Sequence, residues 1–196
     1  SIANETAVST TSSGTSVAQA TAAASSSQNQ SKYEANVASV AGKMDNRVIA
    51  AYQQLGFKIV VDPSVNYSGY FDARSRSITM KQIDDSVYHE LGHFLAFIAG
   101  NVDKTASFQS IFAAEKANVT AFNKAYVTQN ASEYFAESVK DYILNNASLK
   151  STRPQTYAAV QNALNQITDA QIAKIQKIYG CLLYTSPSPR DKRQSR

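Results

Sequence analysis

The spacing of apolar positions divides the chain into three zones. Residues 1–31 are rich in Ser, Thr and Ala and contain one charged residue, Glu5, so they offer too little apolar surface to offset the entropy of ordering. Apolar residues at three- and four-residue spacing begin near Tyr33, and this periodicity stops at Cys181. We therefore predict a disordered Ser/Thr/Ala-rich leader or linker at 1–32, one folded domain at 33–180 and a non-native or disordered tail at 181–196.

The folded zone is predicted to be mostly helical with a small β-sheet, which makes the fold class α+β. A first helix is expected over about residues 33–56, because glycine at position 56 is a common stop signal. Two runs, 57–61 and Ser77–Met80, are predicted as strands, and the segment between them, which contains Gly69, as a loop. Further helices are expected at 104–117, 131–146, 154–166 and 170–179.

One more predicted helix carries both histidines of the chain, in the sequence His89-Glu90-Leu91-Gly92-His93. Positions i and i+4 share a helix face, so both imidazoles can reach one metal ion while Glu90 lies beside the open coordination position. This pattern predicts a zinc peptidase site. The alternative is a pair of half-buried histidines that are satisfied by hydrogen bonds.

The ends and the buried face of this helix also follow from the sequence. Asp84 and Asp85 can cap its start, and Gly100 marks its end. The residues expected on its buried face are Val87, Leu91, Phe94, Leu95 and Ile98.

A catalytic zinc usually takes three protein ligands and a water, so the two histidines need a third partner, expected to be a carboxylate. The helix predicted at 131–146 carries Glu133 and Glu137 at i, i+4 spacing, which lets one bind the metal while the other orients a ligand. Two other interpretations stay open at this point. Glu133 also fits a capping box that begins at Asn130, and Glu137 fits an exposed helix residue beside Lys140.

The two motifs together, His89-Glu90-Leu91-Gly92-His93 and Glu133-Tyr134-Phe135-Ala136-Glu137, resemble the catalytic domain of anthrax lethal factor and the related secreted bacterial Pro-Pro endopeptidases. The resemblance covers roughly residues 35–180. It implies a zincin-like metallopeptidase domain whose small sheet packs against the HExxH helix. It also implies one Zn²⁺ per chain held by His89, His93 and Glu133, with Glu137 behind the ligands and Tyr126 stabilising the transition state.

The activity that this resemblance implies is that of a secreted zinc-dependent metalloendopeptidase, with Glu90 as general base toward a zinc-activated water. One departure is Ala96, where related proteins often carry an aspartate. The competing hypothesis is therefore a secreted non-catalytic binding or surface module with a vestigial zinc site. Glu90 argues against it, because a structural site has no use for a base. A deformylase-like site is disfavoured, since the cysteine ligand expected upstream is missing.

The strand predicted at Ser77–Met80 lies directly before the motif helix. We expect it to form the sheet edge at which an extended protein or peptide substrate adds as a further strand. Ser77, Ile78, Thr79 and Met80 are then the predicted substrate-binding residues. Pairing of this strand with residues 57–61 inside the core is the alternative interpretation, and both can hold.

Charge and cysteine content narrow the possible classes of protein and of binding partner. The formal net charge is +4, but residues 181–196 supply most of it, so the domain gives no support for a nucleic-acid partner. This tail resembles a translated sequencing-adapter read and holds the single cysteine, so no disulfide framework is possible. No apolar run is long enough to span a membrane. We expect an extracellular, secreted bacterial protein, assumed to be a monomer, whose start at Ser1 fits signal-peptide removal or a fragment equally well.

Overall fold

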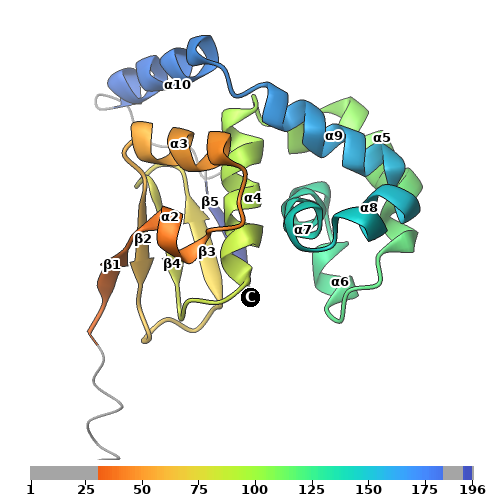
Figure 1. The fold of residues 1–196 in the computed structure, drawn as a ribbon, viewed down its shortest axis with the longest axis horizontal. Helices are drawn as coiled ribbons and strands as arrows, with labels where there is room; N and C mark the ends of the chain where they lie inside the picture. The colour runs from red at the N-terminus through yellow and green to blue at the C-terminus, as the bar shows by residue number, and fades with distance from the viewer. Residues whose placement is uncertain (1–30, 183–191, 196) are drawn as a thin grey trace, which may run out of the picture. The chain divides into compact units, whose positions relative to one another are not determined.

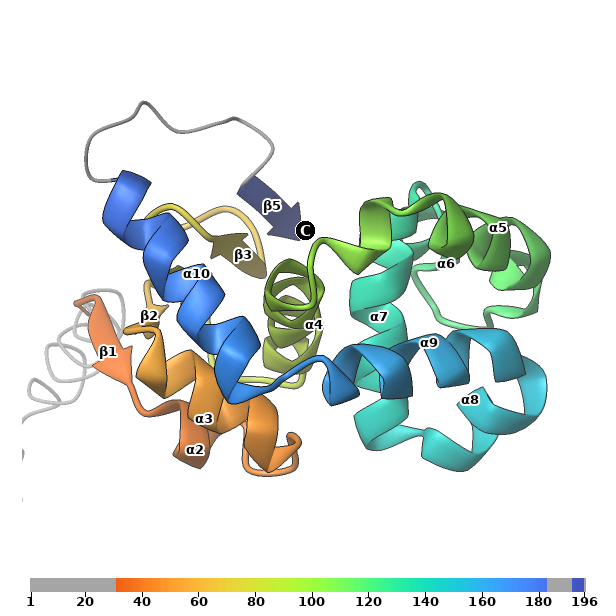
Figure 2. The same cartoon turned by 90° about the horizontal axis from the view of Figure 1, so that it is seen from above.

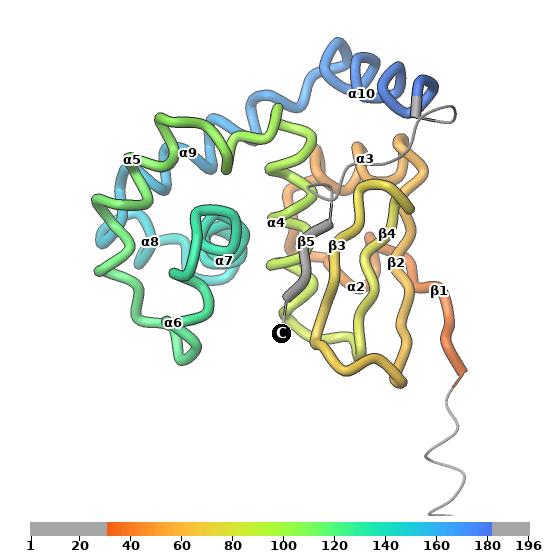
Figure 3. Tube along the Cα trace, turned by 180° about the vertical axis from the view of Figure 1, so that it is seen from behind, coloured from red at the N-terminus to blue at the C-terminus, as the bar shows by residue number. Residues whose placement is uncertain are grey.

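Five short strands form a mixed sheet in the computed structural model, which describes residues 31–182 and 192–195. Two of them, β2 and β4, run parallel, and the other neighbours are antiparallel. Figure 3 shows the strands side by side. In spatial order they are β1 (Tyr33–Ala35), β2 (Lys58–Val61), β4 (Ser77–Met80), β3 (Gly69–Asp72) and β5 (Lys192–Ser195).

Three helices cover one face of this sheet (Figure 1). They are α2 (Val37–Val40), α3 (Asn46–Gln54) and α4 (Ser86–Ile98). Alternate strand residues point to opposite faces, and those turned toward the helices are buried, whereas Val60, Tyr70 and Thr79 on the other face are half-buried. The first part of the core therefore lies between the sheet and α4. Its strand residues are Ile59, Val61, Phe71, Ile78 and Met80.

A second group of helices lies on the side of α4 that faces away from the sheet (Figure 2). The helices of this group are α5 (Ala106–Glu115), α6 (Lys124–Val127), α7 (Ala131–Leu144), α8 (Asn146–Thr152) and α9 (Pro154–Asn165), with the short 3₁₀ helices η1 (Val102–Lys104) and η2 (Lys116–Asn118). The last helix, α10 (Asp169–Leu182), contacts α4. None of the described helices is long and apolar enough to cross a membrane.

The helices α4 and α7 pack directly against each other, and Gly92 permits this close approach. A Cβ atom at Gly92 would lie 2.6 Å from the carbonyl oxygen of Ala136 and 2.7 Å from its Cα. Those distances are shorter than any ordinary packing contact, and the neighbouring atoms belong to rigid helical backbone. The glycine of the first motif therefore faces the alanine of the second, and this small pair brings the two motifs together.

The α+β class and both predicted strands are confirmed, and a helix occupies most of each segment predicted from 104 onward. The single helix predicted at 33–56 is wrong. Its first residues form β1, and the remainder is divided into α2 and α3 because two side chains start new helices. Asn36 Oδ1 accepts a hydrogen bond from the Ala38 amide at 2.9 Å, and Asp45 Oδ1 accepts one from the Arg47 amide at 2.9 Å.

The prediction that Ser77–Met80 forms a sheet edge for substrate is also wrong. This strand, β4, pairs on one side with β2, as the alternative interpretation expected, and on its other side with β3. The segment around Gly69, predicted as a loop, supplies β3 and so covers the edge. Ser77, Ile78, Thr79 and Met80 are therefore interior residues of the sheet, and β3 is the strand with which β5 pairs.

The predicted boundaries near the two ends stay predictions. The leader at 1–32 lies almost wholly outside the described residues, and so does most of the tail. Cys181 and Leu182 continue α10, and Lys192–Ser195 form β5. The described residues from Lys32 onward belong to one compact unit.

Candidate metal centre

The helix α4 carries the first half of the candidate site, and its sequence explains where it begins and ends. Asp84 Oδ1 accepts a hydrogen bond from the Ser86 amide at 3.0 Å, whereas Asp85 makes no side-chain cap. The helix stops before Gly100, which has a φ of 77°, a conformation that favours glycine. All five residues predicted for its buried face are buried, which confirms that prediction.

The structure brings His89, His93 and Glu133 together at the contact between α4 and α7. One ligand atom from each of the three lies within 4.8 Å of the others. Glu133 Oε2 is 2.9 Å from His89 Nε2 and 3.4 Å from His93 Nε2. All three residues are buried, with exposed fractions of 4%, 0% and 7%. The spacing of the two motifs therefore produces one cluster from two helices.

Of the capping box that the sequence left open for Glu133, the Asn130 cap is present, but the Glu133 carboxylate faces the histidines instead of the cap. The backbone amide of Glu133 donates to Asn130 Oδ1 at 2.8 Å, so Asn130 caps α7 as predicted. Its carboxylate turns toward the two histidines. The residue is therefore capped through its main chain and is free to act as a ligand through its side chain.

Glu137 lies one turn further along α7 and holds the other side of the His89 ring. Its Oε2 is 2.7 Å from His89 Nδ1, and it is buried, with 8% of its surface exposed. Lys140 Nζ is 3.8 Å from its other oxygen. Because Glu137 accepts a hydrogen bond from Nδ1, it orients the ring, and a metal ion that displaced the Nε2 proton would meet the Nε2 lone pair.

The charges of this cluster shift its proton affinities strongly. Burial alone would lower the pKa of His89, but hydrogen bonds to Glu133 and Glu137 raise it to about 10. Burial likewise would raise the pKa of Glu133, whereas its hydrogen bonds to His89 and His93 lower it to about 2. In the absence of a metal ion, the His89 ring therefore carries a proton, because the carboxylates of Glu133 and Glu137 favour its positive charge.

Donor chemistry and spacing fit zinc. Zinc binds imidazole nitrogen and carboxylate oxygen at about 2.0 to 2.2 Å, so its protein donors must lie within about 4 Å of one another. The two pairs that Glu133 makes with the histidines, at 2.9 and 3.4 Å, meet that requirement. Two imidazoles and one carboxylate leave a fourth position open, as in catalytic sites.

The other predicted site residues lie as follows. Glu90 is on α4 between the histidines and is fully buried. Tyr126 is on α6, which packs against α7, and its ring is half-buried against the core. Ala96, the departure from the family pattern, is a fully buried core residue. The catalytic roles of Glu90 and Tyr126 stay predictions.

The sequence reasoning missed one residue beside the site, Gly69 in β3. A Cβ at this position would lie 2.8 Å from Glu90 Cγ. Its signal in the sequence is weak, because a glycine within a Tyr/Asn/Ser-rich stretch resembles a turn. The aromatic residues that follow, Tyr70 and Phe71, are the clue that favours a strand.

Fold and site together define an α+β domain with a candidate two-histidine, one-glutamate metal centre. Residues 72–163 match the family described as anthrax toxin lethal factor, N- and C-terminal domain. A protein named Pro-Pro endopeptidase, from Clostridioides difficile (strain 630), is 41% identical over 78 residues, which cover 38% of this chain and 34% of that relative. The matched part thus spans about a third of the relative's length. These matches confirm the resemblance to the lethal factor and Pro-Pro endopeptidase family that the two motifs predict.

Proposed function

We propose that this chain is a zinc-dependent metalloendopeptidase that hydrolyses peptide bonds in an extended protein or peptide substrate. The observation that carries the proposal is the convergence of His89, His93 and Glu133 at one buried point, with Glu90 between the two histidines on α4. Similarity to a relative named for endopeptidase activity supports it. The secreted, extracellular location expected from the leader stays a prediction.

When bound, zinc would act as a Lewis acid that lowers the pKa of a water molecule and polarises a peptide carbonyl. His89, His93 and Glu133 would hold it, and Glu137 would keep His89 oriented. Glu90 accepts a proton from the attacking water as the new carbon–oxygen bond forms. It then passes that proton to the leaving amine as the carbon–nitrogen bond breaks.

Tyr126 is the proposed second contact for the reacting carbonyl. Its hydroxyl donates a hydrogen bond to the oxygen on which negative charge develops, a kind of contact worth about 2.7 to 4 kcal/mol in other enzymes. We therefore expect Tyr126→Phe to lower turnover by about a hundredfold or more while zinc stays bound.

The substrate strand is assigned to the side of β3 that β5 occupies in this structure, because β4 lies between β2 and β3. A peptide that adds to β3 runs antiparallel to it, as β5 does. Backbone hydrogen bonds then supply affinity, and side-chain contacts supply selectivity.

Peptide cleavage by wild type and Glu90→Gln tests the proposal. We expect wild-type protein to cleave members of a peptide library that includes Pro-Pro sequences, and Glu90→Gln to bind zinc but cleave nothing. Glu34→Gln is the matched control, since Glu34 is an exposed partner of Lys58 in the sheet. Unchanged cleavage by Glu90→Gln would contradict the assigned base. A zinc-loaded wild type without cleavage would favour the binding-module hypothesis.

A further inference from the structure

The carboxylate of Glu90 lies in a closed space beneath the sheet. The residue has no exposed surface, although it lies on a helix whose histidines face α7. The negative charge of Glu90 contributes to the pKa shifts of two tyrosines. Burial raises the pKa of Tyr52 and of Tyr67, and the negative charge of Glu90 raises each further. The contact that locates the Glu90 side chain is the one with Gly69, the first residue of β3.

Gly69, the first residue of β3, lies directly against the Glu90 side chain. A Cβ atom there would lie 2.8 Å from both Cγ and Oε1 of Glu90 and 3.0 Å from its Cδ. Glu90 cannot simply turn into solvent to avoid that clash, because it is fully buried. The glycine is thus required for space, since its φ is not in the left-handed region.

The main chain of Gly69 points to the side of β3 at which β5 lies. The amide of Lys81 on the β4 side donates to the Ser68 carbonyl at 3.2 Å, so Ser68 faces β4. In an antiparallel ladder, successive residues direct their N–H and C=O groups to alternate sides. The amide and carbonyl of Gly69 therefore face the edge at which β5 pairs Gly69 with Ser195.

We propose that Gly69 is a positioning residue that sets the general base against the substrate backbone. Its main chain, which pairs with β5 in this structure, pairs with the substrate when the substrate strand takes the place of β5, and the space left by its missing Cβ holds the Glu90 carboxylate. Gly69 thereby fixes the distance between the bound substrate strand and the Glu90 carboxylate, which takes the proton. This inference rests on the proposed peptidase function.

Kinetics of Gly69→Ala test the positioning. We expect about one zinc per chain still, since the three ligands are untouched, with kcat lowered by about a hundredfold and KM little changed. Gly42→Ala is the matched control, because a Cβ there would make an ordinary contact of 3.7 Å with the Ala38 carbonyl oxygen. Wild-type kcat in Gly69→Ala would overturn the proposal.

A second measurement separates failure of this inference from failure of the proposed function. Thermal unfolding needs no peptidase activity, so Gly69→Ala is compared in the Glu90 and Glu90→Ala backgrounds. We expect the substitution to lower Tm when Glu90 is present and to have little effect when its side chain is removed. An equal loss of Tm in both backgrounds would overturn the contact, whether or not the wild type cleaves peptides.

Discussion

At the scale of single residues, Glu133 shows why the site could be predicted only in part. Its position three residues after Asn130 suits a cap, and its spacing from Glu137 suits a ligand pair. Helical spacing cannot choose between these roles, because the direction of the carboxylate depends on α4 packing beside α7. The resemblance of the two motifs to a known family supplied the choice. Nothing comparable pointed to Gly69, whose importance appears only when β3 lies over Glu90.

Removal of the Glu137 carboxylate is predicted to weaken metal binding without removing a ligand. Glu137→Ala takes away the acceptor of the His89 Nδ1 proton, so the imidazole loses both its orientation and part of its basicity. Loss of such a partner typically lowers metal affinity by about 10- to 100-fold. Competition with a chromophoric zinc chelator measures this change, and Glu34→Ala serves as control. Unchanged affinity would show that Glu137 does not support His89.

At the scale of elements, the periodic helix α4 and the apolar strands β2 and β4 were predictable, whereas the strand β3 was not. The apolar face of α4 repeats over 13 residues, and this pattern identified it without any knowledge of its neighbours. The strand β3 has four residues and begins with glycine, and it exists because β4 and β5 supply its hydrogen bonds. Pairing between distant segments leaves little local trace in the sequence. The error about the substrate edge followed from missing this one strand.

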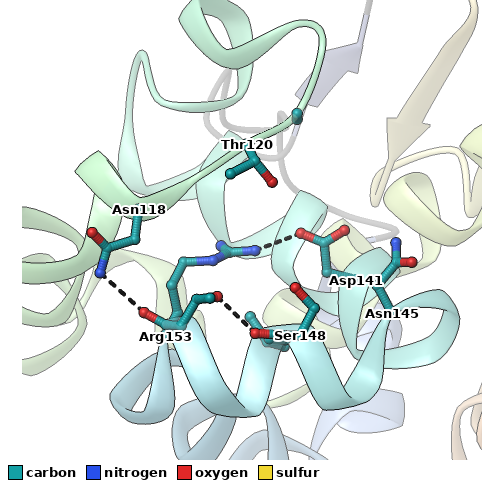
Figure 4. Close-up of a pocket in the computed structure, with 9 residues that line it drawn as sticks. Asn118, Thr120, Asp141, Asn145, Ser148 and Arg153 are labelled. Atoms are coloured by element: carbon teal, nitrogen blue, oxygen red, sulfur yellow. Dashed lines mark hydrogen bonds and ion pairs between the residues drawn. The ribbon is translucent and has the colours of Figure 1, made fainter.

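The corner between α7, α8 and α9 contains a buried ion pair that we expect to be important for stability. Arg153 Nη2 is 2.5 Å from Asp141 Oδ2, and Nη1 donates to Ser138 Oγ at 3.1 Å. Figure 4 shows the guanidinium directed toward Asp141. Both residues line a polar cavity of about 280 Å³. The side chain of Arg153 is 6% exposed, so loss of the cation leaves a partly buried carboxylate without its partner.

Arg153→Met is therefore predicted to destabilise the fold by about 3 to 5 kcal/mol, which corresponds to a fall in Tm of roughly 10 °C. Thermal unfolding followed by circular dichroism measures it. The double variant Arg153→Met, Asp141→Asn should recover part of the loss, because the uncompensated charge is gone. A Tm within about 2 °C of wild type for Arg153→Met would contradict this account.

At the scale of the whole molecule, the stability of the metal-free protein should depend on pH in a defined direction. The pKa of His89 is raised from 6.5 to about 10, so its contribution is complete below pH 6.5 and is lost as pH rises toward 10. The pKa of Glu133 is lowered from 4.5 to about 2, so its contribution is complete above pH 4.5 and is lost as pH falls toward 2. The metal-free protein should therefore be most stable between pH 4.5 and 6.5.

Thermal unfolding in the presence of a chelator, from pH 3 to about 10, checks this window. Added zinc should move the maximum to higher pH, because the metal takes the place of the His89 proton. Glu133→Ala should lose much of the dependence above pH 6.5. Stability of the chelated wild type that rises steadily from pH 6.5 upward would contradict the pairing of His89 with its two glutamates.

The central claim is that α4 and α7 together form a zinc site, and the zinc content of purified protein tests it most directly. Mass spectrometry of the native protein and elemental analysis should find about one zinc per chain in the wild type and little in Glu133→Ala, with Glu34→Ala as the control that retains it. Absence of zinc from a folded wild type supplied with the metal would contradict the account, because the three ligands would then lie together for another reason.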